Sequence, residues 1–202
     1  MKDLISIIKE NSFLGMNQKT IDKLKSPDNQ PLMQSGTIVY KNSIYMKNKI
    51  LYLIAKINGA KELFCISEND IKNDFEGEKS ELEGIFIRKI PFNYNNSVVI
   101  QKLFPFTKPI SLRKIKTTIG CGDRLGLASP GHIRAARIFK ISPVLAQQSM
   151  RELNFTGRTY KDVVADAAFG VFQEGFEDGY GADGDHLKNI SDIDSALDAG
   201  MP

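Results

Sequence analysis

The chain has 202 residues, of which 42% are hydrophobic and 25% charged, and its formal net charge at pH 7 is +3. This composition excludes a disordered chain and is typical of one ordinary domain, or of a small domain with part of a larger one. No run approaches the roughly 20 apolar residues that a membrane helix requires, so we expect no membrane span. Cys65 and Cys121 lie far apart, which favours neither a disulfide framework nor a zinc site and fits a reducing cytoplasm.

Positive charge is concentrated in the first 116 residues, whereas the remainder is net negative. A basic half can indicate a nucleic-acid partner. Here the lysines are scattered through alternating sequence such as YKNSIYMKNKI and form no block. We therefore expect a solvated lysine-rich surface and no nucleic-acid binding.

The first half of the chain predicts a small β-rich region with a helical start. Residues 1–30 predict helical segments that end in the turn-forming run SPDNQP. Residues 36–67 are rich in Ile, Tyr and Val with short polar breaks, a pattern typical of antiparallel strands joined by hairpins. Residues 68–83 predict a loop with a frayed helix, and GIFIRKI and SVVIQKLF predict two more strands. We place this helical cap and β-rich region at residues 1–112.

From residue 113 strands alternate with helices. The runs TTIGCG, SPVLAQQS and GYGADGDHLK predict strands, and a segment with helical periodicity follows each of them. This order predicts a parallel sheet covered by helices, hence an α/β fold. Three such units do not close a barrel. We expect residues 113–202 to be an incomplete TIM-like (β/α) barrel, and the alternative is an open sandwich that lacks its partners.

Residues capable of chemistry follow each predicted strand. In a βα barrel the loops at the carboxyl ends of the strands build the site, so these residues are expected to converge. The three groups are Gly122-Asp123-Arg124, Gln147-Gln148 and Asp183-Gly184-Asp185-His186.

The first group suits an anionic ligand. Asp123 could act as a base or ligand, and the planar fork of Arg124 matches a carboxylate. A helix that begins near Ser129 would offer free N–H groups to an anion. The alternative is that Asp123 and Arg124 pair with neighbours and only brace the loop. Gln148 could bind hydroxyls or a carbonyl, or simply cap its strand.

The run DGDH places His186 directly after Asp185. A neutral imidazole flanked by carboxylates suits a divalent metal, although a solvated surface loop would give the same pattern. A metal site needs at least three protein ligands, so the others would have to come from strands outside this chain. We expect His132 to be a surface or supporting residue and Cys121 to be a small buried side chain.

The runs TIGCGDRLGLASPGHIRAA, PVLAQQSMRE, TGRTYKDVVADAAFGVFQEGF and DGYGADGDHLK resemble the first part of the tagaturonate epimerase family. The resemblance covers residues 97–202 and implies a cytoplasmic, divalent-metal-dependent epimerase on a TIM-like barrel, acting on a small hexuronate. It implies His186 as a metal ligand and Asp185 as the proton acceptor. It further implies that Asp123, Arg124 and Gln148 contact the substrate.

Members of that family are much longer than this chain, so the later metal ligands and a second proton carrier are expected elsewhere. Inversion at C3 next to a keto group needs one base and one acid on opposite faces of the carbon. Only one of them is proposed here, and we therefore expect the chain alone to be inactive. The alternatives are a non-catalytic relic or binding domain, and a fragment of another metal-dependent sugar isomerase or aldolase barrel.

Overall fold

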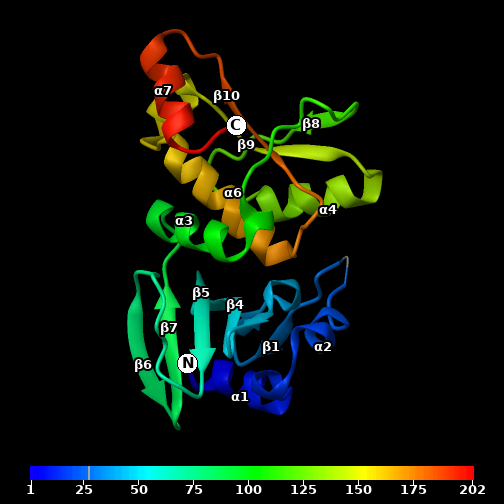
Figure 1. Ribbon diagram of the computed structural model, residues 1–202, viewed down its shortest axis with the longest axis vertical. Helices are drawn as coiled ribbons and strands as arrows, with labels where there is room; N and C mark the ends of the chain where they lie inside the picture. The colour runs from blue at the N-terminus through cyan, green and yellow to red at the C-terminus, as the bar shows by residue number, and fades with distance from the viewer. Residues whose placement is uncertain (27) are drawn as a thin grey trace. The chain divides into compact units, whose positions relative to one another are not determined.

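The computed structural model describes residues 1–26 and 28–202, so the predicted SPDNQP turn lies partly outside the described residues. The chain divides into two compact units, Met1–Pro91 and Phe92–Pro202, each of which is identifiable by colour in Figure 1. The division falls ahead of residue 112, where the sequence analysis places it. Residues beyond Pro91 join the second unit because the Phe92 ring stacks on Phe169, with centroids 4.1 Å apart.

The first unit is an antiparallel sheet preceded by short helices. The helices are α1 (Lys2–Glu10), η1 (Phe13–Gly15) and α2 (Gln18–Asp22), and η2 (Lys41–Ser43) lies between strands. The strands are β1 (Leu32–Gln34), β2 (Thr37–Val39), β3 (Tyr45–Lys47), β4 (Ile50–Ile57), β5 (Ala60–Ser67), β6 (Glu78–Leu82) and β7 (Ile85–Ile90). Their order is β1-β2-β4-β5-β7-β6, with β3 also paired to β4, and every pairing is antiparallel. The predicted antiparallel sheet is confirmed.

Tight turns set the register of this sheet. Both central residues of four two-residue turns have positive φ, which matches the right-handed twist of the flanking strands. The turns are Ser35-Gly36, Asn48-Lys49, Asn58-Gly59 and Glu83-Gly84. The apolar face so aligned is buried against α1, whose Leu4, Ile5, Ile7 and Ile8 are at most 3% exposed.

Two predictions for this half were wrong. Residues 78–82 form β6 and not a loop. The sequence did not indicate a strand there, because β6 is a charged edge strand with mostly exposed residues and no alternation of apolar and polar side chains. The run SVVIQKLF lies largely in helix α3 (Tyr94–Leu103) and not in a strand. The Asn93 side chain accepts the Asn96 N–H and caps that helix, and this signal outweighs the β-propensity of the valines.

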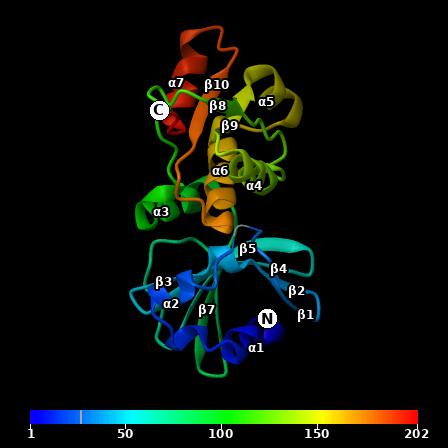
Figure 2. The same cartoon turned by 90° about the vertical axis from the view of Figure 1, so that its right-hand side faces the viewer.

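The second unit contains a parallel sheet in the order β10-β9-β8 (Figures 1 and 2). Its strands are β8 (Thr118–Gly120), β9 (Ser142–Ser149) and β10 (Gly181–Asp185). Its helices are α3, η3 (Pro105–Thr107), α4 (Ser129–Phe139), α5 (Met150–Thr156), α6 (Tyr160–Glu174) and α7 (Ile190–Asp198). Three parallel strands in this order are as predicted. Helix α5 was not predicted, because it is short and directly follows a strand.

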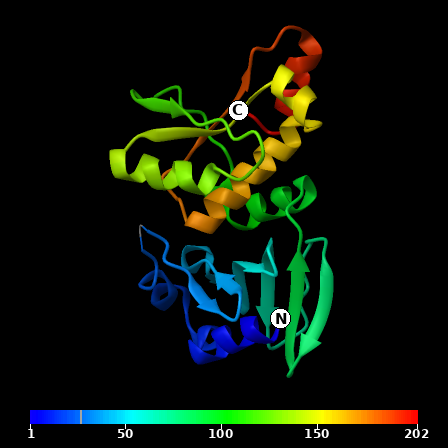
Figure 3. The same cartoon turned by 180° about the vertical axis from the view of Figure 1, so that it is seen from behind.

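Helices α4 and α6 lie together along one face of this sheet and contact β9 (Figure 3). The predicted apolar face of α6 is buried, with each of its members at most 3% exposed: Val163, Val164, Ala167, Ala168, Val171 and Phe172. Four of them, Val163, Val164, Ala167 and Val171, belong to the same hydrophobic cluster as Leu145 and Ala146 of β9. Within the described residues, no helix is long and apolar enough to cross a membrane.

A bidentate ion pair joins α4 to α6. Arg134 donates from Nε and one terminal nitrogen to the two carboxylate oxygens of Glu174, each at 3.0 Å. The Glu174 side chain is fully buried, whereas that of Arg134 is 41% exposed. Arg137 adds hydrogen bonds to the Glu174 and Gly175 carbonyls, so the arginines of α4 hold the carboxyl end of α6.

We expect Arg134→Met to lower the free energy of unfolding by about 2–3 kcal/mol, because a buried carboxylate would lose its counter-ion. The melting temperature should fall by roughly 4–10 °C. The double variant Arg134→Met/Glu174→Gln should recover most of the loss, since the buried charge is then gone. Melting curves of both single variants and the double variant measure the coupling, and strictly additive losses would contradict it.

Candidate functional site

The carboxyl ends of β8, β9 and β10 meet at one edge of the parallel sheet, as the three strand–loop groups predict. A groove of about 550 Å³ lies there. Four predicted site residues, Asp123, Arg124, Gln148 and Asp185, line it together with His132 and Glu152. The sheet order therefore gathers groups that are up to 62 positions apart in the sequence.

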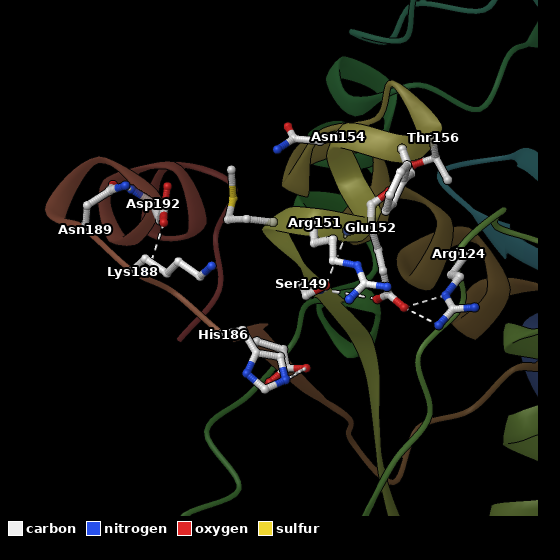
Figure 4. Close-up of a pocket in the computed structure, with 13 residues that line it drawn as sticks. Arg124, Ser149, Arg151, Glu152, Asn154, Thr156, His186, Lys188, Asn189 and Asp192 are labelled. Carbon is white, nitrogen blue, oxygen red and sulfur yellow. Dashed lines mark hydrogen bonds and ion pairs between the residues drawn. The ribbon is translucent and has the colours of Figure 1, made fainter.

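A larger groove of about 1260 Å³ adjoins the first, since Arg124, Glu152 and Asp185 line both. Its other walls come from α5 and from the segment that leads into α7 (Figure 4). His186 lines this larger groove and is absent from the lining of the smaller one. His186, the fifth predicted residue, thus lies in the adjoining groove, next to the segment that leads into α7.

Asp123 is engaged at the start of α4. Its carboxylate accepts the N–H groups of Leu127, Ala128 and Ser129 at 2.7–3.0 Å, and the Ser129 hydroxyl at 3.0 Å. Burial alone would raise the pKa of Asp123, but these hydrogen bonds outweigh it and hold the pKa below its ordinary value. The N–H groups that we expected to bind an external anion therefore bind Asp123. This is the second of the two alternatives, in which Asp123 braces its own loop.

Arg124 forms an ion pair with Glu152 (Figure 4). Glu152 also belongs to a capping box, in which Ser149 and Glu152 satisfy each other's backbone N–H groups at the start of α5. Burial would raise the pKa of Glu152, yet the Arg124 side chain and the Ser149 N–H lower it overall. The sequence analysis missed Glu152, although the S-x-x-E spacing after a strand signals such a cap.

The loop that carries Arg124 is held from a second side. Arg158 donates to the Arg124 carbonyl at 2.9 Å and forms an ion pair with Asp166. Burial raises the pKa of Asp166, although Arg158 opposes the shift. Gly126 has φ +73°, and a Cβ there would meet the Asp166 carboxylate at 2.2 Å, so only glycine fits. Neither Arg158 nor Asp166 was among the predicted site residues.

His186 is 78% exposed and lies 3.4 Å from the Asp185 carboxylate. Its φ is +53°, in the left-handed region that costs an ordinary residue about 1–2 kcal/mol. Within residues 1–26 and 28–202, no group of three or more His, Cys, Asp or Glu side chains could hold a metal ion. The described residues therefore do not form a complete divalent-metal site.

Two polar groups of the smaller groove have no hydrogen-bond partner among the described residues. Gln148 is 2% exposed, and both its amide oxygen and its amide nitrogen are buried and unpaired. Nδ1 of His132, in the first turn of α4, is buried and unpaired as well. The neighbouring Gln147 differs, because it donates to Asp183 at 3.1 Å.

Cys121, at the end of β8, carries no sign of an activated thiol. It is half-buried, and burial raises its pKa above the ordinary value. A raised pKa keeps a thiol protonated and unreactive at neutral pH.

We expect Asp123→Asn to destabilise the chain by about 1 kcal/mol, because the charged cap of α4 is lost. The folded-state pKa of Asp123 is depressed, so its stabilisation is complete above the unfolded value of about 4 and is lost as the pH falls through the folded value. The difference in melting temperature between parent and variant should therefore be full at pH 7 and shrink below about pH 4.

The matched control is Asp178→Asn, at an exposed position, which should change the melting temperature little at any pH. A difference between the parent and Asp123→Asn that stays constant from pH 7 to pH 3 would show that the Asp123 charge does not stabilise α4.

Comparison with known proteins gives matches over most of the chain. The family model of UxaE, tagaturonate epimerase, matches residues 40–202, so the match begins well ahead of residue 97 and includes much of the antiparallel sheet. The tagaturonate/fructuronate epimerase of Thermotoga maritima is 38% identical over 166 residues, which cover 82% of this chain and 34% of that protein.

Comparison with solved structures finds the same family. A glycerol complex of the fructuronate-tagaturonate epimerase UxaE from Cohnella laeviribosi superposes with a TM-score of 0.74 at 41% identity, over 91% of this chain and 35% of that one. The native crystal structure of the same enzyme gives 0.75 at 42% identity, over 83% and 33%. This chain thus spans about a third of the length of these relatives. It belongs to the tagaturonate epimerase family.

Proposed function

We propose that this chain forms part of an epimerase that interconverts D-tagaturonate and D-fructuronate at C3. The observation that carries the proposal is the convergence of Arg124, Gln148 and Asp185 on one groove, in a chain that belongs to this family. The substrate is a small hexuronate, and we place the reaction in the cytoplasm. Two free cysteines are compatible with that compartment.

We further propose that β8, β9 and β10 are the first three strands of a TIM-like barrel. Within the described residues β8 and β10 are the edges of the sheet, so each has one side open for a further strand. Large apolar side chains of this unit are also exposed. They include Leu125, Leu127, Ile138, Phe139, Ile190 and Leu197. Further barrel units would cover such side chains.

Arg124 is proposed to bind the substrate carboxylate. Its side chain is 69% exposed in the ion pair with Glu152, whose own side chain is 27% exposed, and ion pairs at the surface contribute at most about 1 kcal/mol. A substrate carboxylate can therefore take the place of Glu152 at small cost and accept hydrogen bonds from the same guanidinium group. We assign Asp123 the supporting task of holding this loop, because its oxygens are already engaged by α4.

Asp185 is proposed as the proton acceptor. Its side chain is 43% exposed, at the carboxyl end of β10 and within both grooves. It would take the hydrogen from C3, leaving the electron pair shared with the C2 carbonyl as an enolate. A second group on the opposite face would then return a proton to C3 and invert it. This second group is not among the residues that we propose.

The family resemblance implies a divalent metal, which would polarise the C2 carbonyl. His186 is the ligand that we propose this chain contributes. Since the described residues supply no complete set, the other ligands would have to lie elsewhere in a longer protein.

We expect the purified chain to show no conversion of tagaturonate to fructuronate, with or without added Mn²⁺, Zn²⁺, Ni²⁺ or Mg²⁺. We assign only one proton carrier to this chain, and misplacement of reacting groups by about 1 Å already costs roughly a hundredfold in rate. The Cohnella laeviribosi enzyme serves as the positive control in the same assay. Turnover by the chain that His186→Ala abolishes would contradict the expectation.

A further inference from the structure

The smaller groove contains buried polarity that the protein itself leaves unsatisfied. Gln148 lines the groove, yet both ends of its amide are buried and lack a partner among the described residues. An unpaired buried amide destabilises a fold, because the group has lost its water and gained nothing in return. Buried polar groups normally have a hydrogen-bond partner, and the described residues supply none for Gln148.

His132 adds a second unsatisfied group to the same groove. Its Nδ1 is buried without a partner among the described residues, and the ring stands on the first turn of α4, which Asp123 caps. Gln148 comes from β9 and His132 from α4, so two independent elements contribute residues with unpaired polar atoms to the lining of one groove.

The chemistry of these atoms fits hydroxyl groups. A glutamine amide donates two hydrogen bonds and accepts others, and a neutral imidazole nitrogen donates or accepts one. A hydroxyl both donates and accepts, so neighbouring hydroxyls on a carbon chain can satisfy the amide and the imidazole together. The charged groups that line the same groove already have partners: Asp123 accepts hydrogen bonds from the start of α4, and Arg124 pairs with Glu152.

We propose that Gln148 and His132 form a hydroxyl-binding subsite for a polyhydroxylated carbon chain, separate from the carboxylate-binding Arg124. This subsite rests on the proposed function only in one respect, which is that the polyhydroxylated ligand is a hexuronate. A sugar acid would then be held at two points, with its carboxylate at Arg124 and its hydroxyls at Gln148 and His132.

The first experiment uses the whole chain and Gln148→Met, which keeps the side-chain length and removes the amide. If the amide is unpaired in the free protein, the variant should melt at least about 2–4 °C higher than the parent. Gln147→Met is the control, because its amide is already bonded to Asp183, so that no rise is expected. A lower melting temperature for Gln148→Met would overturn the proposal, since the amide would then have a structural partner.

The second experiment titrates the ¹⁵N-labelled chain with mannitol, a neutral polyol. Mannitol should shift the side-chain signals of Gln148 and His132. Gln148→Met and His132→Phe should each weaken its binding by about tenfold, because each removes hydrogen bonds to the ligand. Absence of these shifts at saturating mannitol, or unchanged affinity in both variants, would overturn the subsite.

Titration with D-tagaturonate separates this inference from the proposed function. Binding of both ligands supports both. Mannitol binding without tagaturonate binding would keep the subsite and count against a hexuronate substrate. Tagaturonate binding without mannitol binding would reject the subsite and leave the proposed function standing.

Discussion

The carboxylate of Asp123 determines how the site is built. It stands just beyond β8 and receives three successive backbone N–H groups and a hydroxyl from the start of α4. These N–H groups have no partner within the helix, so their hydrogen bonds to Asp123 stabilise the observed conformation of the loop. Arg124 is the next residue, and its position at the groove follows directly from the cap.

The rest of the site extends this bracing outward. Glu152 binds Arg124 from α5, and Arg158 binds the Arg124 carbonyl while it pairs with Asp166 on α6. Loops from two neighbouring βα units are thus tied together by charged hydrogen bonds. Gln148 and Nδ1 of His132 differ, because they are buried in the same region without a partner among the described residues. These two groups are the ones that we assign to a ligand.

Much of this unit was accessible from the sequence. The boundaries of β9 and the apolar face of α6 followed from hydrophobic periodicity, and the convergence of the three loops followed from parallel strand order. The use of Asp123 as a cap was only one of two alternatives, because an aspartate before a helix start looks the same whether it binds a ligand or the helix. Tertiary pairs such as Arg158 with Asp166 leave no local pattern, and β6 leaves none because its exposed residues are charged.

The central claim is that this segment supplies a working part of an epimerase site. The most direct measurement is the activity of a chimera in which residues 40–202 replace the matching segment of the Cohnella laeviribosi enzyme. The account predicts interconversion of tagaturonate and fructuronate, and its loss on Asp185→Asn with the fold intact. A folded chimera without activity, or one that Asp185→Asn leaves unchanged, would contradict the account.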